Sequence, residues 1–596
     1  MSLRSYLFHE YLYAKGSRRN SNYYSTIVIL MKEKIIGIFN RKEKVYVALI
    51  FLTILFDIPF LKFNVLLSGD EFSMLLVPAY FAGMDWTDFV GIYSFHGYGL
   101  TILLSPLFML FKHNLYQIYL LENLFIRCGL PCLTYKILEE LNPKNKNNFW
   151  IASLCCISTL GSFAGVLASG VENAVAFFFL LTCYFLLKLF KTNKNKYLLF
   201  IFVICAYMIT IHSRVVIFYG SLFFIALLFF WNNKKSLKKV ISKKCILILL
   251  CSLGLIILFN AFNDAILVKF YSSSKEIPNT VASMNPSYTV PVFINFLLSN
   301  TLETLKTFIA LFVSFGYYSF GLFYIWVIFL IMDILDCVKK KVYTPKAYVE
   351  IYGLTALFLM NALYSLKGAR NIVLNQDYKP YTFVRYSLPF CWIIMALGLS
   401  FMFEKVKKSQ IPFWAFVLFV ISAKFYLSYC AKCIQFSTQL TDFKSFLFFK
   451  DKSIFEYFGM ISIIGIFVLF ACILFWKKNS VLIIIMFFCI SFLSRISNFT
   501  YLESCEDEHY EQIDELCKYI EQNEITESYL LGSEHFYYYL QVKEPDVNFI
   551  PLNDIDEFYG NDKKIDIVFT NECVDEVKDN YIFEELDEGE YILYKK

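Results

Sequence analysis

The chain has 596 residues, of which 58% are hydrophobic, and its formal net charge at pH 7 is +5. Charged residues make up 18% of the sequence, whereas an ordinary soluble protein carries about 25%. Almost uncharged runs of roughly 17–25 residues recur, and this length crosses the hydrocarbon core of a bilayer. The composition therefore excludes an ordinary soluble protein and predicts a mainly α-helical, polytopic membrane protein.

Charge divides the chain into two unequal parts. Residues 501–596 hold 27 of the 50 acidic residues but only 7 of the 55 Lys and Arg, so the rest of the chain is strongly basic. We therefore expect a basic cytoplasmic segment over residues 1–44, a transmembrane domain over 45–497 and an acidic extracytoplasmic domain over 498–596. We expect no nucleic-acid partner.

Hydropathy and run length predict about 13 transmembrane helices. The expected spans are residues 45–62, 116–138, 149–166, 172–190, 197–211, 215–231, 245–260, 318–338, 348–365, 386–404, 411–429, 457–475 and 480–496. The Lys-rich connections between them fall on the side of the basic N-terminus, which the positive-inside rule makes cytoplasmic. An odd number of crossings then places the C-terminal domain outside the membrane. The excess of Lys, Ile, Phe, Tyr and Asn is typical of an AT-rich genome and favours a bacterial plasma membrane.

The first predicted outer loop, residues 63–115, contains an acidic pair and a histidine. Asp70 and Glu71 open the loop in "SGDEFSM", and His96 follows in "SFHGYG". The later run "YGLTILLSPLFMLF" is interrupted by a proline, so we expect it to form a helix along the outer interface.

More polar residues occur where the predicted spans meet the same outer face. Glu172 lies at the mouth of the fourth span, His212 and Arg214 lie in the turn "TIHSRVV", and Arg385 and Tyr386 lie in "RYSLPF". Helix capping would also explain Asp70 and Glu172, because carboxylates are favoured at helix N-termini. The histidines and arginines could equally rest at the interface or bind lipid phosphates.

Arginine is scarce, with 9 residues against 46 lysines. The five arginines after residue 41 are Arg127, Arg214, Arg370, Arg385 and Arg495. The predicted topology puts four of them at the outer face and Arg127 inside a span. An ionisable side chain at such depth is a candidate functional residue, and a structural ion pair is the alternative.

The acidic C-terminal region changes periodicity. Helical patterns at "EQIDELCKYIEQ" and "EHFYYYLQV" alternate with strand patterns at "SYLLG", "VNFIPL", "KIDIVFT" and "EYILYKK". This alternation predicts a small α/β domain. It carries no Gly-rich phosphate loop and no metal-ligand spacing, so we expect a binding, lid or packing role for it.

The order of these motifs over residues 45–405 resembles the GT-C superfamily of membrane glycosyltransferases, in particular the branch with protein O-mannosyltransferases and the aminoarabinose transferase. The motifs are "SGDE", "SFHGYG", "GVENAVAFFF", "HSR" and "RYSLP". The resemblance implies a polyprenyl-phosphate-linked sugar donor, transfer to an acceptor hydroxyl on the outer face, and inversion at the anomeric carbon. The acceptor could be a protein, a lipid or a polysaccharide.

The resemblance also implies roles for individual residues. Asp70 would be the catalytic base, Glu71 its partner in acceptor or metal binding, and Glu172 the second acidic position. Arg385 and Tyr386 would handle the phosphate, and His96, His212 and Arg214 would join them in substrate binding. Relatives often have His-Pro-Pro where this chain has His96-Gly97-Tyr98. Some members of the superfamily use a divalent metal and others do not, so the cofactor stays open.

Two other functions fit a polytopic membrane protein with an acidic outer domain. One is a transporter or flippase for a lipid-linked saccharide, which would usually show internal repeats and ionisable residues near mid-membrane. The other is a non-enzymatic partner in surface-glycan assembly, with the acidic domain as its contact surface. The crowding of polar residues at one face favours the glycosyltransferase.

Overall fold

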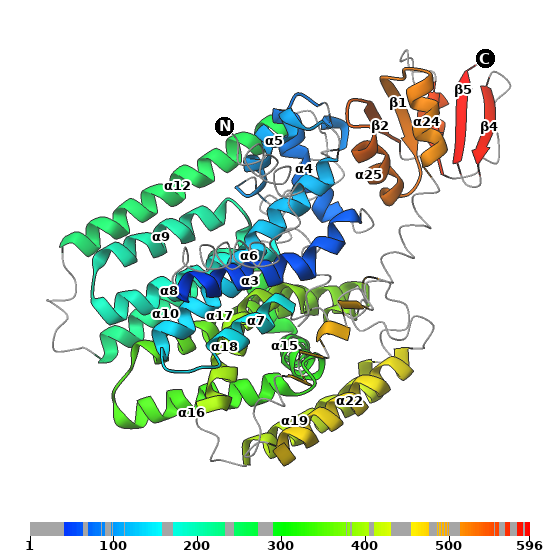
Figure 1. Ribbon diagram of the computed structural model, residues 1–596. Helices are drawn as coiled ribbons and strands as arrows, with labels where there is room; N and C mark the ends of the chain where they lie inside the picture. The colour runs from blue at the N-terminus through cyan, green and yellow to red at the C-terminus, as the bar shows by residue number, and fades with distance from the viewer. Residues whose placement is uncertain are drawn as a thin grey trace, which may run out of the picture.

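The computed structural model is a helical bundle with a small sheet unit at one end (Figure 1). The structure describes residues 41–63, 69–84, 86–89, 97, 99–112, 114–157, 171–232, 243–271, 290–376, 378–381, 384–404, 410–430, 454–475, 485–486, 488–489, 491–493, 495–496, 499, 513–552, 555–559, 567–571, 581–587 and 590–595. Nearly all of the expected N-terminal segment, residues 1–44, lies outside the described residues.

The first half of the bundle consists of α-helices joined by short 3₁₀ turns. Its elements are α3 (Arg41–Asp57), η1 (Ile58–Lys62), α4 (Gly69–Phe81), η2 (Thr87–Phe89), η3 (Thr101–Leu104), α5 (Ser105–Leu110), α6 (Leu115–Leu141), α7 (Asn148–Ile157), α8 (Glu172–Thr192), α9 (Asn195–Ile209), η5 (Ser213–Val215), α10 (Val216–Asn232) and α12 (Lys243–Tyr271). Helices α8, α9 and α12 lie side by side, and α8 also packs on α6 (Figure 1).

The second half adds further long helices and a π-helical turn, η10. Its elements are α14 (Val290–Ser299), α15 (Thr301–Tyr318), α16 (Leu322–Lys340), α17 (Pro345–Asn375), η8 (Lys379–Tyr381), η9 (Arg385–Ser387), α18 (Leu388–Glu404), α19 (Gln410–Phe425), η10 (Tyr426–Cys430) and α22 (Ile454–Phe475). Helix α17 starts as its sequence predicts, because Thr344 accepts a hydrogen bond from the amide of Ala347 and Pro345 occupies the first turn.

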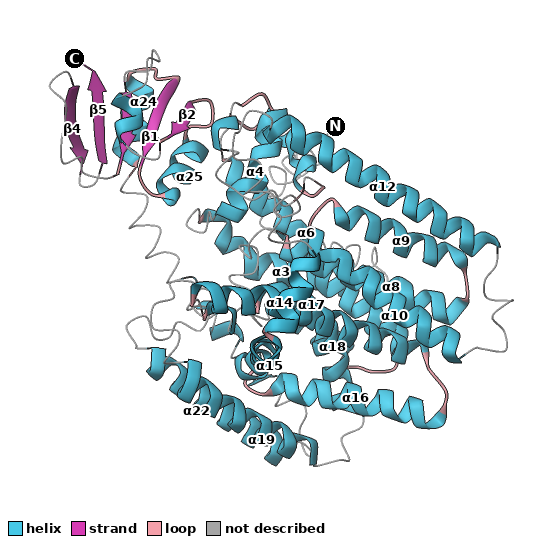
Figure 2. Ribbon diagram, turned by 180° about the vertical axis from the view of Figure 1, so that it is seen from behind, coloured by secondary structure: helices cyan, strands magenta, loops and turns pink. Residues whose placement is uncertain are grey.

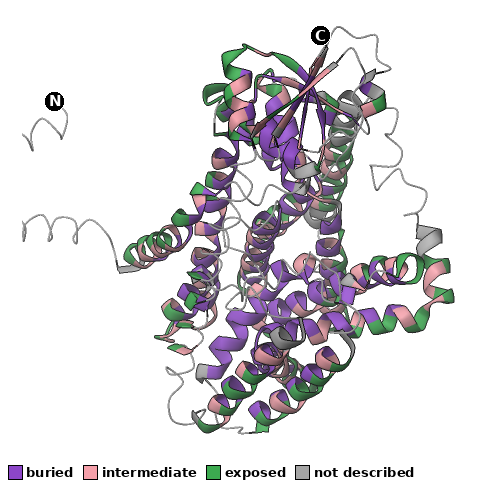
Figure 3. Cartoon of the chain, turned by 90° about the vertical axis from the view of Figure 1, so that its right-hand side faces the viewer, coloured by how far each residue is buried: buried purple, intermediate pink, exposed green. Residues whose placement is uncertain are grey.

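Several of these helices can cross a membrane. Within the described part of the chain, five helices are long and apolar enough: Glu43–Lys62, Glu172–Thr192, Pro345–Asn375, Arg385–Met402 and Gln410–Ser428. Helices α15 and α16 meet at an angle of 112° and would make a sixth span if counted as one. Large apolar side chains are exposed on the bundle, Phe125 by 82% and Trp231 by 73%, and Figure 3 shows exposed residues along its helices. The fold is thus that of a polytopic membrane protein, while the number thirteen stays a prediction.

Helix lengths differ from expectation in the second half. Residues 261–317 were expected to form one outer loop, but α12 continues to Tyr271 and both α14 and α15 follow. The sequence of α15 mixes Thr, Glu and Lys with its apolar residues, so its hydropathy is too low to signal a span. Its break from α16 uses Gly321, whose φ of +82° is a conformation that favours glycine.

The C-terminal region forms an α/β unit with one five-stranded sheet (Figure 2). Its elements are α24 (Asp514–Gln522), β1 (Glu527–Leu531), α25 (Glu534–Lys543), β2 (Asn548–Pro551), α26 (Ile555–Tyr559), β3 (Ile567–Thr570), β4 (Tyr581–Asp587) and β5 (Glu590–Lys595). The strand order is β2-β1-β3-β5-β4, in which β1 is parallel to β2 and β3, and β5 is antiparallel to β3 and β4. The α/β pattern expected from the sequence is present, with α26 and β4 in addition.

The C-terminal unit packs against the first predicted outer loop. The ring of Phe72 in α4 stacks between Trp86, at 5.6 Å, and Tyr538 of α25, at 5.0 Å between centroids. The indole nitrogen of Trp86 donates a 2.9 Å hydrogen bond to the carbonyl of Pro545. Helix α4 is therefore held partly by residues more than 450 positions later in the chain.

Candidate active site

A buried carboxylate with two arginines lies where several long helices begin or end. Glu172 is the first residue of α8 and is 8% exposed. Its Oε1 accepts a 2.8 Å hydrogen bond from Nη2 of Arg214, and Nε of Arg385 lies 3.4 Å from the same oxygen. We call this group, together with Tyr386, the Glu172 cluster. We call the end of the bundle where it lies, at which α8 and α18 begin and α9 ends, the site end.

Two short 3₁₀ turns bring the arginines to Glu172. Arg214 lies in η5, between α9 and α10, and Arg385 opens η9, just before α18. The second turn is fixed to α17 by a 2.6 Å hydrogen bond between Ser387 Oγ and Asn361 Oδ1. The expected residues Glu172, Arg214 and Arg385 are therefore neighbours in space, although up to about 210 positions separate them in the sequence.

Tyr386 provides an aromatic surface for the cluster. The guanidinium of Arg214 lies 4.7 Å from the centre of its ring, which is cation–π geometry. The ring of His212 lies 6.5 Å away, and the backbone amide of Arg214 donates a 3.2 Å hydrogen bond to His212 Nδ1. Because Nδ1 is an acceptor, the neutral imidazole carries its proton on Nε2.

The Glu172 cluster has polar atoms that are buried but have no hydrogen-bond partner among the described residues. Among them are Oε2 of Glu172 and both Nε and Nη1 of Arg214. Two guanidinium groups against one carboxylate also leave the cluster with an excess positive charge. Buried polar groups in native proteins are normally hydrogen-bonded, so the two nitrogens of Arg214 fit an anionic ligand that supplies acceptors, whereas Oε2 of Glu172 needs a donor.

Asp70 and Glu71 lie in the first turn of α4, after Gly69. Glu71 is buried, at 1% exposure. The backbone of Asp70 belongs to the same turn, whereas its side chain lies outside the described residues. Helix α6 packs against both α4 and α8, so the elements that carry Glu71 and Glu172 share one neighbouring helix.

The glycines after His96 have a structural reason. Gly97 has a φ of +119°, and a Cβ there would lie 2.2 Å from the carbonyl oxygen of Thr210. The amide of Gly99 donates a 2.9 Å hydrogen bond to the same carbonyl. Proline fixes φ near −65°, so a His-Pro-Pro sequence could not make this contact. The loop after His96 rests on the turn that carries His212 and Arg214, while His96 itself lies outside the described residues.

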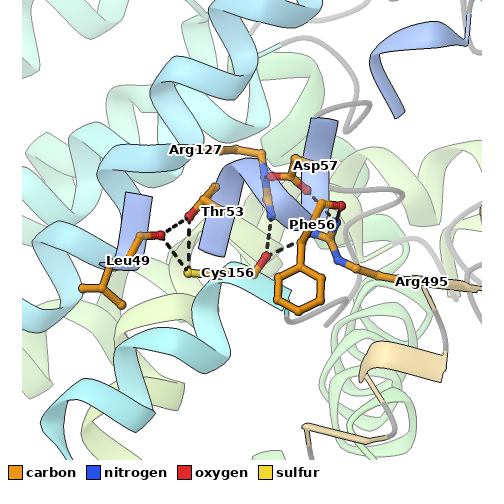
Figure 4. Close-up of polar contacts among 7 residues, drawn as sticks. All are labelled: Leu49, Thr53, Phe56, Asp57, Arg127, Cys156 and Arg495. Carbon is orange, nitrogen blue, oxygen red and sulfur yellow. Dashed lines mark hydrogen bonds and ion pairs between the residues drawn. The ribbon is translucent and has the colours of Figure 1, made fainter. Parts of the chain in front are cut away.

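Two other arginines have a different environment (Figure 4). Arg127 Nε and Arg495 Nη1 lie 2.6 and 2.5 Å from the two oxygens of Asp57, which is completely buried. Both arginines also donate to the carbonyl of Cys156, at 3.3 and 3.2 Å. We call this group the Asp57 cluster. For these two arginines, the structural ion pair is the better interpretation.

Asp57 is a residue that the sequence reasoning did not single out. It is the lone acid of its span, in "LFDIPF", and the rule that marks intramembrane ionisable residues would have found it.

A divalent metal would need a group of at least three His, Cys, Asp or Glu side chains. No such group occurs within the described ranges, which leave out the side chain of Asp70.

Comparison with known proteins gives a fold but no sequence family. No family model matches the chain, and no curated protein matches it significantly. Among solved structures, it is similar to the crystal structure of ArnT from Cupriavidus metallidurans bound to undecaprenyl phosphate, with a TM-score of 0.50 and 8% sequence identity. The match covers 92% of this chain and 97% of the other. The chain therefore has the same fold as this ArnT structure, which agrees with the fold that the motif resemblance to the aminoarabinose transferase branch implies.

Proposed function

We propose that the protein is a membrane glycosyltransferase that moves a sugar from a polyprenyl-phosphate-linked donor to an acceptor hydroxyl on the extracytoplasmic face. The observation that carries this proposal is the Glu172 cluster, a buried site with excess positive charge and unpartnered donors at the mouth of apolar helices. The similarity to a structure whose title names undecaprenyl phosphate supports a donor of this class.

In this proposal the arginines bind the donor phosphate. Arg214 and Arg385 face the same carboxylate oxygen, so Glu172 holds both guanidinium groups in place, and Nε and Nη1 of Arg214 are left to bind a ligand. Guanidinium binds phosphate through a planar fork and stabilises the negative charge that grows as the phosphate departs. Tyr386 supports Arg214 from one side, and His212 and His96 complete the substrate pocket.

Asp70 acts as the general base. The acceptor oxygen attacks the anomeric carbon while its proton passes to the Asp70 carboxylate. The bond from that carbon to the phosphate oxygen breaks, polyprenyl phosphate leaves with the electron pair, and the anomeric configuration inverts. Glu71, one residue on, assists acceptor binding or a divalent metal. We place the reaction on the outer face of a bacterial plasma membrane, with the N-terminus cytoplasmic and the C-terminal domain outside, and we expect a protein, lipid or polysaccharide acceptor.

Replacing Asp70 tests the proposal directly. Asp70→Asn removes the base at nearly constant shape, so turnover should fall by about 10²–10⁴-fold while donor binding is kept. The assay is release of polyprenyl phosphate by the purified full-length protein from a panel of sugar-linked donors. Asp336→Asn is the matched control, because Asp336 is an exposed carboxylate in α16.

The same panel separates the competing functions. Turnover of Asp70→Asn equal to that of the parent protein would refute the general-base role. A flippase would move the intact lipid-linked sugar across vesicles without releasing polyprenyl phosphate, and a non-enzymatic partner would do neither. Either result would overturn the glycosyltransferase proposal.

A further inference from the structure

A cavity lies outside the Glu172 cluster. It has a volume of about 500 Å³ and is lined by Lys306, Tyr381, Ile421, Lys424, Phe425 and Ser428. These residues come from α15, η8, α19 and η10. None of them belongs to the Glu172 cluster, yet Tyr381 precedes Arg385 by only four residues.

The wall of this cavity is firmly built. Tyr381 is 1% exposed, and its carbonyl accepts a 2.9 Å hydrogen bond from Ser314 of α15. Its hydroxyl donates to Glu303, which also pairs with Lys306 at 3.2 Å. The turn η8 is thereby fixed to α15, so the cavity has a defined shape before any ligand enters.

The lining is almost wholly apolar and includes the side chains of two lysines, Lys306 and Lys424. Ile421, Phe425 and the ring of Tyr381 give a mostly apolar wall, and the lining contains no carboxylate. The side chain of Lys306 is half exposed, and Lys424 has no ion-pair partner within the described ranges. When the negative charge of Glu303 is set against the positive charges of Lys306 and Lys424, a net charge of about +1 remains.

The position of the lysines suits a lipid headgroup. Lys424 lies four residues from the end of the candidate span Gln410–Ser428, which is the depth at which lysine side chains reach the interface. A water-soluble anion would gain little from the apolar wall, whereas a lipid phosphate uses both parts of the cavity. We propose that this cavity binds the phosphate of an anionic lipid, with the first part of the lipid chain against Ile421 and Phe425.

The lipid phosphate could come from bulk phospholipid or from polyprenyl phosphate, and binding assays distinguish the two. Native mass spectrometry of the full-length protein would count adducts of dioctanoyl phosphatidylglycerol, farnesyl phosphate, inorganic phosphate and dioctanoyl phosphatidylcholine. We expect binding of one or both anionic lipids and weak binding of the zwitterionic lipid and of inorganic phosphate. Which anionic lipid binds more tightly identifies the source.

Two variants connect binding to this cavity. Lys306→Gln/Lys424→Gln should weaken anionic lipid binding by about 10–30-fold, because each lysine near a headgroup contributes about one kcal/mol. Ile421→Trp keeps the charges but fills the cavity from an exposed position, so it should weaken binding as well. Lys339→Gln/Lys340→Gln, at the far end of α16, is the matched control and should bind as the parent does.

Three results would overturn the proposal. They are unchanged binding by both cavity variants, equal binding of phosphatidylcholine and phosphatidylglycerol, and an equal loss in the Lys339/Lys340 control. Because the variants leave Asp70 and the Glu172 cluster intact, this outcome is independent of the test of the glycosyltransferase.

Discussion

The two buried carboxylate clusters contain the same ingredients and differ in how far their hydrogen bonds are satisfied. In the Asp57 cluster, each oxygen of Asp57 has its own arginine, and further arginine N–H groups bind the carbonyls of Phe56 and Cys156. In the Glu172 cluster, both arginines face one oxygen, and Oε2 of Glu172 and two nitrogens of Arg214 have no hydrogen-bond partner among the described residues.

This difference separates a structural centre from a candidate binding site. Arg127 keeps one unpartnered nitrogen, Nη1, but the rest of the Asp57 cluster is occupied by protein atoms. Such a centre ties α3, α6 and the region of Arg495 together and offers a ligand little. In the Glu172 cluster, N–H groups of Arg214 beside the ring of Tyr386 have no partner within the described part of the chain. An anion that accepts hydrogen bonds from them would therefore stabilise the cluster.

The largest expected effect is on the stability of the Asp57 cluster. Asp57→Asn leaves two buried guanidinium groups without a counter-charge, which should cost about 3–5 kcal/mol. We expect low yield or a clearly lower midpoint of thermal unfolding in detergent. A midpoint within about one degree of the parent's, in a protein measured at equal yield, would contradict the structural interpretation.

Next in size is the effect of Arg214→Ala on activity. Loss of a hydrogen-bond donor that stabilises the departing phosphate typically costs 10²–10³-fold in turnover, about 3–4 kcal/mol. Binding of the lipid-linked sugar donor should weaken too. The unfolding midpoint should change far less than in Asp57→Asn. Arg370→Ala, at an arginine outside both clusters, is the control. Equal activity of Arg214→Ala and the control would show that the Glu172 cluster is structural after all.

Lysine replacements sharpen the comparison further. Arg495 uses Nη1 and Nη2 on different partners, and a lysine cannot reproduce this fork, so Arg495→Lys should destabilise the protein by about 1–3 kcal/mol.

In the Glu172 cluster, Arg385→Lys keeps a positive charge near the proposed site of the donor phosphate. It should therefore retain more binding of the sugar donor than Arg385→Ala. Equal donor affinity of Arg385→Lys and Arg385→Ala would argue against a phosphate role.

The smallest effect sets the baseline for both clusters. Lys112, which follows α5, forms an ion pair with Asp546 of the C-terminal unit, with 3.3 Å between Nζ and Oδ1. Both side chains are 58% exposed. Exposed pairs contribute about 0–1 kcal/mol, so Lys112→Ala should shift the unfolding midpoint only slightly, and less still at high salt. A loss as large as that of Asp57→Asn would mean that burial does not govern these ion pairs.

Much of the fold could be predicted because it depends on local pattern. The α/β alternation of the C-terminal region predicts β1, α25, β2 and β3, and the turn "HSR" predicts η5. Strand β4, "YIFEELD", was missed because its three acids interrupt the apolar alternation. Helix α15 was missed because its hydropathy is lowered by the polar residues of its first two turns.

The pairings at the site could not be predicted in the same way. Arg127 and Arg214 are both isolated arginines near apolar runs, and the predicted topology separates them only by depth. Their partners lie 70 and 42 positions away, and the sequence does not show how many of their hydrogen bonds are satisfied. Predicted sidedness gathers Glu172, Arg214 and Arg385 on one face, but it cannot say which oxygen each arginine meets.

The stack of Phe72 between Trp86 and Tyr538 also determines when α4 can complete its packing during biosynthesis. The hydrogen bond from Trp86 to Pro545 joins residues 459 positions apart, and a ribosome adding about 5–20 residues per second needs about 25–90 s to cover that distance. During this interval, α4 and its acidic pair exist without their C-terminal packing partner. A nascent chain therefore completes the packing around α4 only at the end of its synthesis.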